Sequence, residues 1–192
     1  MIYLASTSPR RKALLKKYGI KFKVIKPYYE EIDDLKIVPS KMVKQHALEK
    51  AKSCTAQVER GFILAADTIV YQDGRVIGKP KNMKEAIRIL NSLQGRWHSV
   101  FTGVAVIKID DGKSVKQFLF SEKTKVKLKV MSSQEIKKYI KKINPLDKAG
   151  AYAIQSKNQN IINRVTGSLN NAVGLPIESV LQKFKSLKIG KK

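Results

Sequence analysis

Cysteine is almost absent from this chain of 192 residues, in which Cys54 is the only one. A single thiol excludes an internal disulfide and a metal site built from several cysteines. Cys54 falls within a helical pattern of apolar residues, which predicts a small core side chain. We therefore expect a reducing, cytoplasmic setting.

Long hydrophobic runs are also missing. No apolar stretch approaches the roughly 20 residues that a membrane helix needs. The apolar residues at the N-terminus precede the basic cluster Arg10-Arg11-Lys12, which reverses the order found in a secretory signal. We expect neither a membrane span nor a signal peptide.

Acidic residues are scarce: 15 Asp and Glu stand against 39 Lys and Arg, giving a formal net charge of +24. Such a field attracts nucleic acids, acidic membranes and polyphosphate substrates alike. The lysines occur along the whole chain. Two interpretations stay open, a generally solvated cationic surface and a dedicated nucleic-acid-binding stripe.

What is present predicts a folded α/β protein. Hydrophobic residues make up 43% of the chain, a normal globular fraction, and neither a linker nor a repeat divides it. Residues 1–192 are therefore predicted to form a single domain. Strands and helices alternate at first and hairpins follow, which favours a mixed sheet. The predicted strands span 2–5, 22–25, 62–70, 76–77, 100–109, 118–130, a short stretch near Tyr152, and 161–165. The predicted helices span 9–18, a long segment from Pro39, 82–93, a segment from Ser132 to before Pro145, and 176–184.

The turn between the first strand and the first helix is a candidate phosphate site. Ser8 is a favourable N-cap and Pro9 suits the first helical position. A helix N-terminus that also carries Arg10 and Arg11 would bind an anion through backbone N–H groups and guanidinium forks. The alternative is an ordinary capped helix with surface arginines.

Asp67 is the sharper signal, because it interrupts the apolar run from Phe62 to Val70. A buried carboxylate must be paired, hydrogen-bonded or bound to a metal. The alternatives are a structural salt bridge and a carboxylate that holds Mg²⁺ or orients a water.

Other polar residues carry weaker signals. Lys79 lies between Gly78 and Pro80 and could point into a cleft, whereas His46 and His98 are predicted to be packing residues. The segment 147–155 places polar anchors among small residues, and Gln155 could read a base edge through its amide. The sequence contains no P-loop, no HExxH helix and no GxSxG elbow.

Taken together, these segments resemble the Maf family of nucleotide pyrophosphatases. The resemblance covers nearly the whole chain in order: Leu4-Ala5-Ser6-Thr7-Ser8-Pro9-Arg10-Arg11, Glu49-Lys50-Ala51, Ala66-Asp67-Thr68, Gly78-Lys79-Pro80, His98-Ser99-Val100 with Thr102-Gly103, Asp147 to Gln155, and Gly174-Leu175-Pro176. It implies an α/β fold of the Maf/ITPase type, with a mixed, elongated, bent sheet, flanking helices and two lobes around a cleft. It also implies a homodimer, since the family is often dimeric.

The resemblance further implies hydrolysis of a nucleoside triphosphate to the monophosphate and pyrophosphate, assisted by Mg²⁺ or Mn²⁺. By position, Asp67 matches the catalytic carboxylate and Glu31 an acidic residue that helps to bind the metal. Ser8, Arg11, Lys50 and Lys79 match the phosphate-binding residues. Arg10, Thr68 and Gln155 match the positions that separate subgroups and resemble those of the dTTP/UTP pyrophosphatases. Whether modified pyrimidine nucleotides are also substrates stays open.

A rival interpretation is a basic nucleic-acid-binding or growth-regulating protein without significant catalysis. The sequence lacks an RNA-recognition aromatic motif, zinc fingers and a clear helix-turn-helix. Nucleic-acid binding is left open by the net charge alone.

Overall fold

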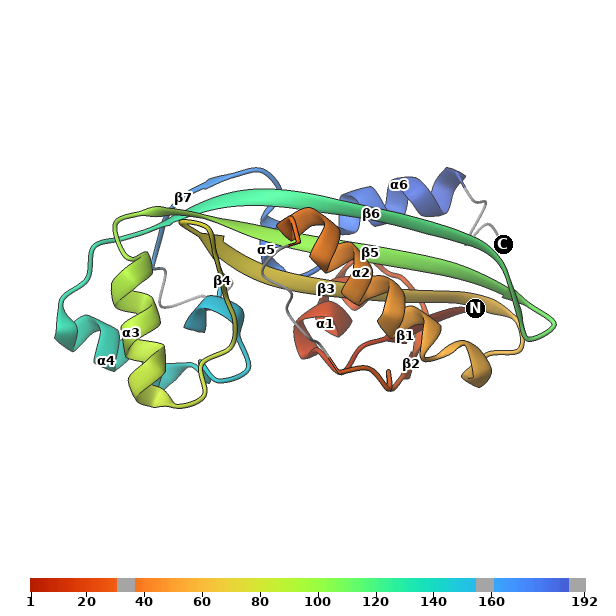
Figure 1. Cartoon of the computed structure of the whole chain (residues 1–192), viewed down its shortest axis with the longest axis horizontal. Helices are drawn as coiled ribbons and strands as arrows, with labels where there is room; N and C mark the ends of the chain where they lie inside the picture. The colour runs from red at the N-terminus through yellow and green to blue at the C-terminus, as the bar shows by residue number, and fades with distance from the viewer. Residues whose placement is uncertain (31–36, 155–160, 187–192) are drawn as a thin grey trace.

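A long, curved β-sheet runs through the molecule, with helices packed on both faces (Figure 1). The computed structural model describes residues 1–30, 37–154 and 161–186. Two residues of the predicted site, Glu31 and Gln155, lie outside these ranges.

Within these ranges the strands alternate with helices in the first half of the chain and form hairpins in the middle. The strands are β1 (Ile2–Ala5), β2 (Phe22–Ile25), β3 (Gly61–Gln72), β4 (Arg75–Ile77), β5 (Trp97–Asp110), β6 (Lys113–Leu128) and β7 (Ile162–Thr166). The helices are α1 (Pro9–Lys17), α2 (Pro39–Lys52), α3 (Met83–Leu93), α4 (Ser133–Lys142), α5 (Leu169–Val173) and α6 (Ile177–Ser186), with short 3₁₀ turns at Thr55–Gln57 and Ala149–Ala151.

The sheet is mixed, as predicted. Its strand order is β2-β1-β3-β5-β6-β7, and β4 pairs with the far end of β3. β1 lies parallel to β2 and β3, whereas the later pairs are antiparallel. Figure 1 shows α3 and α4 at one end of the sheet and α1, α2 and α6 at the other, which agrees with the predicted elongated fold with two lobes.

One edge of β3 has a gap in its strand pairing. β1 pairs with β3 as far as Leu64, and β4 begins to pair at Val70. Among the described strands, none pairs with residues 65–69 on that side. The edge of a strand carries backbone donors and acceptors, so this five-residue gap is a natural place for a ligand.

Alternation along β3 sends consecutive side chains to opposite faces of the sheet. Ile63 and Ala65 pack with α2 in one buried cluster. Leu64 and Ala66 pack on the other face, in the cluster of α1 and α6. Asp67 and Thr68, which lie in the gap, therefore approach it from the two faces of the sheet.

Gly103 of β5 lets α2 lie directly against the sheet. It is the register partner of Asp67, and a Cβ built on it would lie 2.1 Å from the carbonyl oxygen of Val43. A Cβ at that distance would overlap the main chain of Val43, which can move only if α2 shifts as a whole. The absence of a side chain at Gly103 thus fixes how closely α2, and with it Lys50, approaches Asp67.

Most of the predicted elements are confirmed. The capping box of Ser132 and Glu135 is present, and the Asn82 side chain caps α3 at the backbone N–H of Glu85. Cys54 is fully buried, as predicted for a core residue. Burial raises the pKa of its thiol.

In the last third of the chain, one prediction is wrong and one helix was missed. Tyr152 does not lie in a strand but directly after the 3₁₀ turn, because Gly150 and Ala151 adopt positive φ values of 72° and 59° that break an extended run. The five-residue helix α5 was not predicted, since it is too short to show a periodic pattern.

The helices of the described ranges include none that is both long enough and apolar enough to cross a membrane. The assignment of residues 1–192 to one domain stays a prediction.

Substitution of Gly103 tests the close approach of α2. We expect Gly103→Ala to lower the free energy of unfolding by about 3 kcal/mol or more, because the new Cβ would overlap the main chain of Val43. Gly78→Ala is the matched control, since nothing lies within 4 Å of its Cβ position, and it should change stability by less than about 0.5 kcal/mol. Urea unfolding measures both values. Equal stabilities of the two variants would contradict the packing described here.

Candidate active site

A cavity of about 690 Å³ lies at the gap in β3. It is lined by residues that lie far apart in the sequence. They come from the segment 5–11, from Lys26, Pro27 and Tyr29, from Lys50, from β3, from Lys79, from Val100 of β5, from the segment 147–154, and from residues 172–174.

The topology of the parallel strands explains this position. β1 and β2 end at Ala5 and Ile25, and both run parallel to each other. Ligands of α/β proteins bind outside the carboxyl ends of parallel strands. The residues that follow these ends, Ser6 and Lys26, accordingly line the cavity.

Lys50 and Asp67 form a buried ion pair on the cavity wall. Lys50 Nζ donates to Asp67 Oδ1 at 2.6 Å, and the two side chains are only 8% and 5% exposed. An ion pair removed from water gains little net stability, because desolvation offsets the attraction. Packing alone therefore gives no reason for a charged pair at this point.

The second carboxylate oxygen of Asp67 strengthens this argument. Oδ2 is buried and has no hydrogen-bond partner among the described residues. A buried acceptor left without a partner is costly. Such an oxygen at a cavity wall is suited to a bound water or a hard cation.

The first turn of α1 is held by Ser6. Ser8 occupies the predicted N-cap position, but its side chain makes no capping bond. Instead the buried Ser6 Oγ accepts from the Ser8 backbone N–H and from Arg11 Nη1, both at 3.2 Å. Ser6 thereby fixes the turn, and the hydroxyl of Ser8 is not used to cap the helix.

Arg11 joins three parts of the cavity wall. Its Nε donates to the carbonyl oxygen of Gly174 at 2.9 Å, and its Nη2 donates to Thr68 Oγ1 at 3.2 Å. Gly174 has a φ of 121°, which disfavours any residue with a side chain. Thr68 is hydrogen-bonded in turn to Thr102 at 3.0 Å. The guanidinium is thus fixed in direction as well as position.

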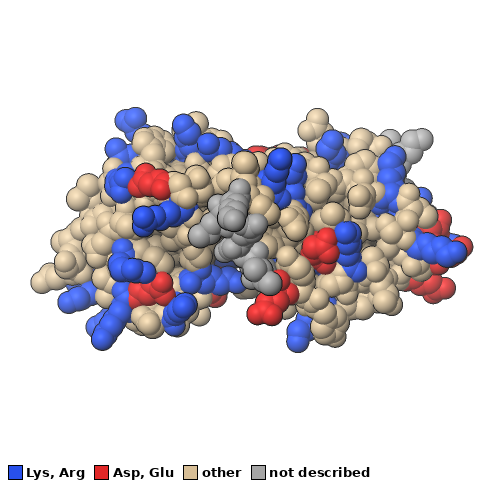
Figure 2. Space-filling model, viewed as in Figure 1, with Lys and Arg blue, Asp and Glu red and all other residues tan. Residues whose placement is uncertain are grey.

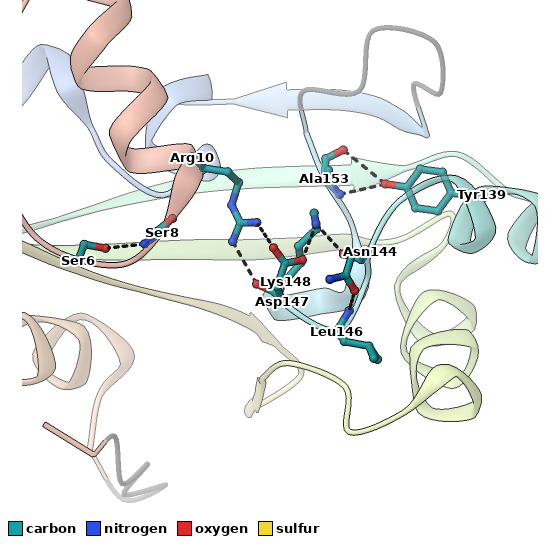
Figure 3. A network of polar contacts seen from close by, with 9 residues as sticks. All are labelled: Ser6, Ser8, Arg10, Tyr139, Asn144, Leu146, Asp147, Lys148 and Ala153. Atoms are coloured by element: carbon teal, nitrogen blue, oxygen red, sulfur yellow. Dashed lines mark hydrogen bonds and ion pairs between the residues drawn. The ribbon is translucent and has the colours of Figure 1, made fainter. Parts of the chain in front are cut away.

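Arg10 reaches across the cavity to the segment after α4 (Figure 3). Its Nη1 lies 3.3 Å from Asp147 Oδ2, and its Nη2 donates to the Asp147 carbonyl oxygen at 3.2 Å. Lys148 Nζ donates to the other oxygen of the same carboxylate. Burial would raise the pKa of Asp147, but Lys148 and Arg10 outweigh it and lower that pKa.

Lys79 also lines the cavity, as predicted from its place between glycine and proline. The loop that carries it is tied to the 3₁₀ turn, because the backbone N–H of Gly150 donates to the carbonyl oxygen of Gly78 at 3.1 Å. The loop that carries Lys79 and the 3₁₀ turn at Ala149–Ala151 therefore form one connected part of the cavity wall.

The two histidines are structural, as predicted. His98 is 3% exposed, and its Nε2 is hydrogen-bonded to the Tyr152 hydroxyl at 2.7 Å. Burial lowers the pKa of His98 to about 4. It also raises the pKa of Tyr152, with a further contribution from Tyr139. His46 is buried too, and its Nδ1 is hydrogen-bonded to the Tyr29 hydroxyl at 2.8 Å.

Seven of the nine predicted site residues line one cavity: Ser8, Arg10, Arg11, Lys50, Asp67, Thr68 and Lys79. The other two, Glu31 and Gln155, lie outside the described residues. No cluster of three or more His, Cys, Asp or Glu side chains suited to a metal occurs in the described ranges.

The sequence patterns did not predict Lys26, Tyr29 and Lys148 as site residues, although these side chains also line the cavity. A signal for Lys26 was available, because it directly follows a predicted strand that could run parallel to the first. Lys148 lay in the predicted polar segment but received no role. Tyr29 follows no recognisable element boundary.

The comparisons with known proteins identify the family of the chain. The sequence model of the Maf family, described as Maf-like protein, matches residues 1–187. A protein of Thermosipho melanesiensis named dTTP/UTP pyrophosphatase is 44% identical over 180 residues, covering 93% of each chain. A protein of Dictyoglomus thermophilum with the same name is 43% identical and covers 92% of this chain and 90% of its own length.

Among solved structures, the Ham1 protein of Staphylococcus aureus has a TM-score of 0.50 and covers 97% of this chain and 98% of its own. At 15% identity, this likeness concerns the fold alone. It confirms the predicted fold class.

The low pKa of His98 predicts a pH dependence of stability. Because the folded pKa of about 4 lies below the ordinary value of 6.5, the unfolded chain binds the proton first as the pH falls. The contribution of neutral His98 is complete above pH 6.5 and is lost progressively down to pH 4, by about 3 kcal/mol in total. Urea unfolding of wild type and His98→Gln at several pH values measures this effect. The difference in unfolding free energy between the two should change between pH 6.5 and 4, and parallel curves would contradict the assignment.

Proposed function

The chain belongs to the Maf family, as its sequence motifs predicted, and on this premise we propose that it hydrolyses dTTP and UTP to the monophosphate and pyrophosphate. The named relatives supply the substrate class. The observation that supports it most directly is the buried Asp67, paired with Lys50 in a cavity whose other charged residues are mostly cationic.

Asp67 is proposed as the proton acceptor for the attacking water. Lys50 holds Oδ1, which leaves Oδ2 to accept a hydrogen bond from that water. The water oxygen forms a bond to the α-phosphorus while its proton passes to the carboxylate. The bond from the α-phosphorus to the α–β bridging oxygen breaks, and pyrophosphate leaves with that electron pair. A positioned base of this kind contributes about 10²- to 10⁴-fold to a rate.

Ser8, Arg11, Lys50 and Lys79 are proposed to bind the triphosphate. A triphosphate carries about four negative charges, and cleavage moves charge onto the leaving pyrophosphate. Cations fixed beforehand stabilise that developing charge without reorganising. The contacts of Arg11 with Ser6 and Thr68 supply this fixed geometry.

Arg10, Thr68 and Gln155 are proposed to select the base. Arg10 is held by Asp147 and Thr68 by Thr102, so both present defined surfaces to a substrate. The role of Gln155 rests on the family resemblance, because this residue lies outside the described ranges. The proposed pyrimidine preference therefore depends on Arg10 and Thr68, whose contacts are given above, and on Gln155, whose role is inferred from the resemblance.

The chemistry of Asp67 fits a divalent cation. Oδ2 of Asp67 offers two lone pairs, so beside the attacking water it could also bind a cation such as Mg²⁺ or Mn²⁺, which prefer carboxylate oxygens. Mg²⁺ is commonly bound by one or two carboxylates together with substrate phosphates, so Asp67 with Glu31 would suffice. Bound there, the cation would neutralise phosphate charge. Glu31 keeps this proposed role on the resemblance alone, and the homodimer and the cytoplasmic location stay predictions.

A panel of nucleotides tests the activity and its specificity. Pyrophosphate and monophosphate release from dTTP, UTP, dATP, GTP and 7-methyl-GTP is measured with Mg²⁺ or Mn²⁺ and with EDTA. We expect kcat/KM for dTTP and UTP to exceed that for the purines by about tenfold or more, and EDTA to abolish turnover. Fastest turnover on a purine rejects the pyrimidine preference, and no release from any nucleotide rejects the function.

The role of Asp67 is tested by a charge-neutral substitution. Asp67→Asn should lower kcat by about 10³-fold, because the amide cannot accept the proton, while circular dichroism shows an unchanged fold. Asp73→Asn is the matched control. It makes the same change at an exposed turn residue outside the cavity and should keep wild-type activity. Near wild-type pyrophosphate release by Asp67→Asn would show that the role is misassigned.

A further inference from the structure

One face of the sheet carries aromatic and cationic side chains beyond the N-terminal end of α2. We define this lysine–aromatic face by its members: Tyr71 of β3, Trp97 and Phe101 of β5, Lys123, Lys125 and Lys127 of β6, and Arg164 of β7.

The strand register places these side chains side by side. Tyr71, Ser99, Lys125 and Thr166 are successive register partners across four strands. Trp97, Lys127 and Arg164 form a second row, and Phe101 and Lys123 a third. Register partners lie on the same face of a sheet. The longest of these rows spans three inter-strand spacings, or about 14 Å.

The alternate residues explain why this face is open. Val100, Thr124, Val126 and Leu128 point to the opposite face and are buried there. On the near face, Val43 of α2 touches the sheet at Gly103, and Met42 and Val43 also pack with Ile69 and Phe101. Beyond that point Trp97 is 43% exposed. A hollow of about 560 Å³ lies there, lined by Tyr71, Phe101, Lys123, Lys125 and their neighbours.

The charge of the face is not neutralised. None of Lys123, Lys125, Lys127 and Arg164 has an ion-pair partner within residues 1–30, 37–154 and 161–186. Asp73 lines the hollow but is paired with Arg96 at 2.7 Å. Lys123 Nζ lies 5.4 Å from the centre of the Phe101 ring. Figure 2 shows basic side chains at both ends of the molecule, so charge alone does not single out this face. Its combination with the exposed ring of Trp97 and the half-buried rings of Tyr71 and Phe101 does.

We propose that the lysine–aromatic face binds single-stranded nucleic acid. Exposed aromatic rings on a sheet stack with unpaired bases, and neighbouring lysines bind the phosphates between them. A base pair in a duplex hides the ring faces that would stack, which favours a single strand. A second copy of this chain is a poorer partner. A two-fold contact through this face would set its unpaired lysines against each other.

This binding is separate from nucleotide hydrolysis. The hollow and the active-site cavity share no lining residue. A nucleoside triphosphate should therefore not displace the strand, and loss of either activity should leave the other intact.

Trp97 provides a direct probe, because it is the only tryptophan of the chain. The full chain is titrated with a 12-nucleotide oligo-dT, and tryptophan fluorescence is recorded together with the anisotropy of a labelled strand. We expect the fluorescence to be quenched in step with binding, and the affinity to fall steeply with salt. A duplex of the same length should bind at least tenfold more weakly.

Two triple variants with equal net charge separate a specific face from general attraction. Lys123→Gln/Lys125→Gln/Lys127→Gln removes the lysines of the face. Lys137→Gln/Lys141→Gln/Lys142→Gln removes three exposed lysines of α4. We expect the first to weaken binding by tenfold or more and to reduce the salt slope by about 2, and the second by less than about twofold. Both should keep wild-type dTTP hydrolysis. Trp97→Leu should also weaken binding by about tenfold, since base stacking is worth ~1–3 kcal/mol.

Four results would overturn the proposal. The first is equal loss of affinity in the two triple variants, and the second is binding without any change in Trp97 fluorescence. The third is displacement of the oligonucleotide by dTTP, which would place it in the active-site cavity. The fourth is a dimer in solution that dissociates only in the first triple variant, which would make this face a contact between copies of the chain.

Discussion

The ion pair between Lys50 and Asp67 is the interaction on which the rest of the site depends. Two opposite charges lie buried 2.6 Å apart, and the fold is arranged to bring them there. Gly103 removes the side chain that would hold α2 away from the sheet, and the gap in strand pairing leaves Asp67 at the edge of β3. A buried pair of this kind is weak evidence for stability, so its presence is better explained by the chemistry of the cavity.

The cations of the cavity differ in how they are held. Arg10 and Arg11 make defined hydrogen bonds to Asp147, Ser6, Thr68 and Gly174. Lys148 shares the carboxylate of Asp147 with Arg10. The contact between Arg10 and Asp147 joins α1 to the segment after α4. Arg10, which is proposed to select the base, is thus also the residue that connects the two walls.

Local sequence patterns predicted the mixed sheet, the principal helices and strands, and five residues of the cavity (Ser8, Arg10, Arg11, Asp67 and Lys79), because apolar runs and helix-start signals act locally. The patterns did not predict features that depend on contacts between residues far apart in the sequence. Tyr152 was assigned to a strand since nothing local announces the left-handed Gly150 and Ala151. Lys50 was recognised only through the family resemblance, and its bond to Asp67 depends on how closely α2 approaches Gly103. Tyr29 and Lys148 reach the cavity through tertiary packing that no single segment records.

The edge of β3 at residues 65–69, which has no strand partner among the described residues, consists of main-chain groups. Its peptide groups form part of every variant of this protein, whatever side chains replace Ala66 or Thr68. Recognition that uses the main chain is inherited with the fold and does not drift as residues change. A substitution of Thr68 would therefore change a side chain of the proposed site while the main-chain donors and acceptors of this edge stay the same.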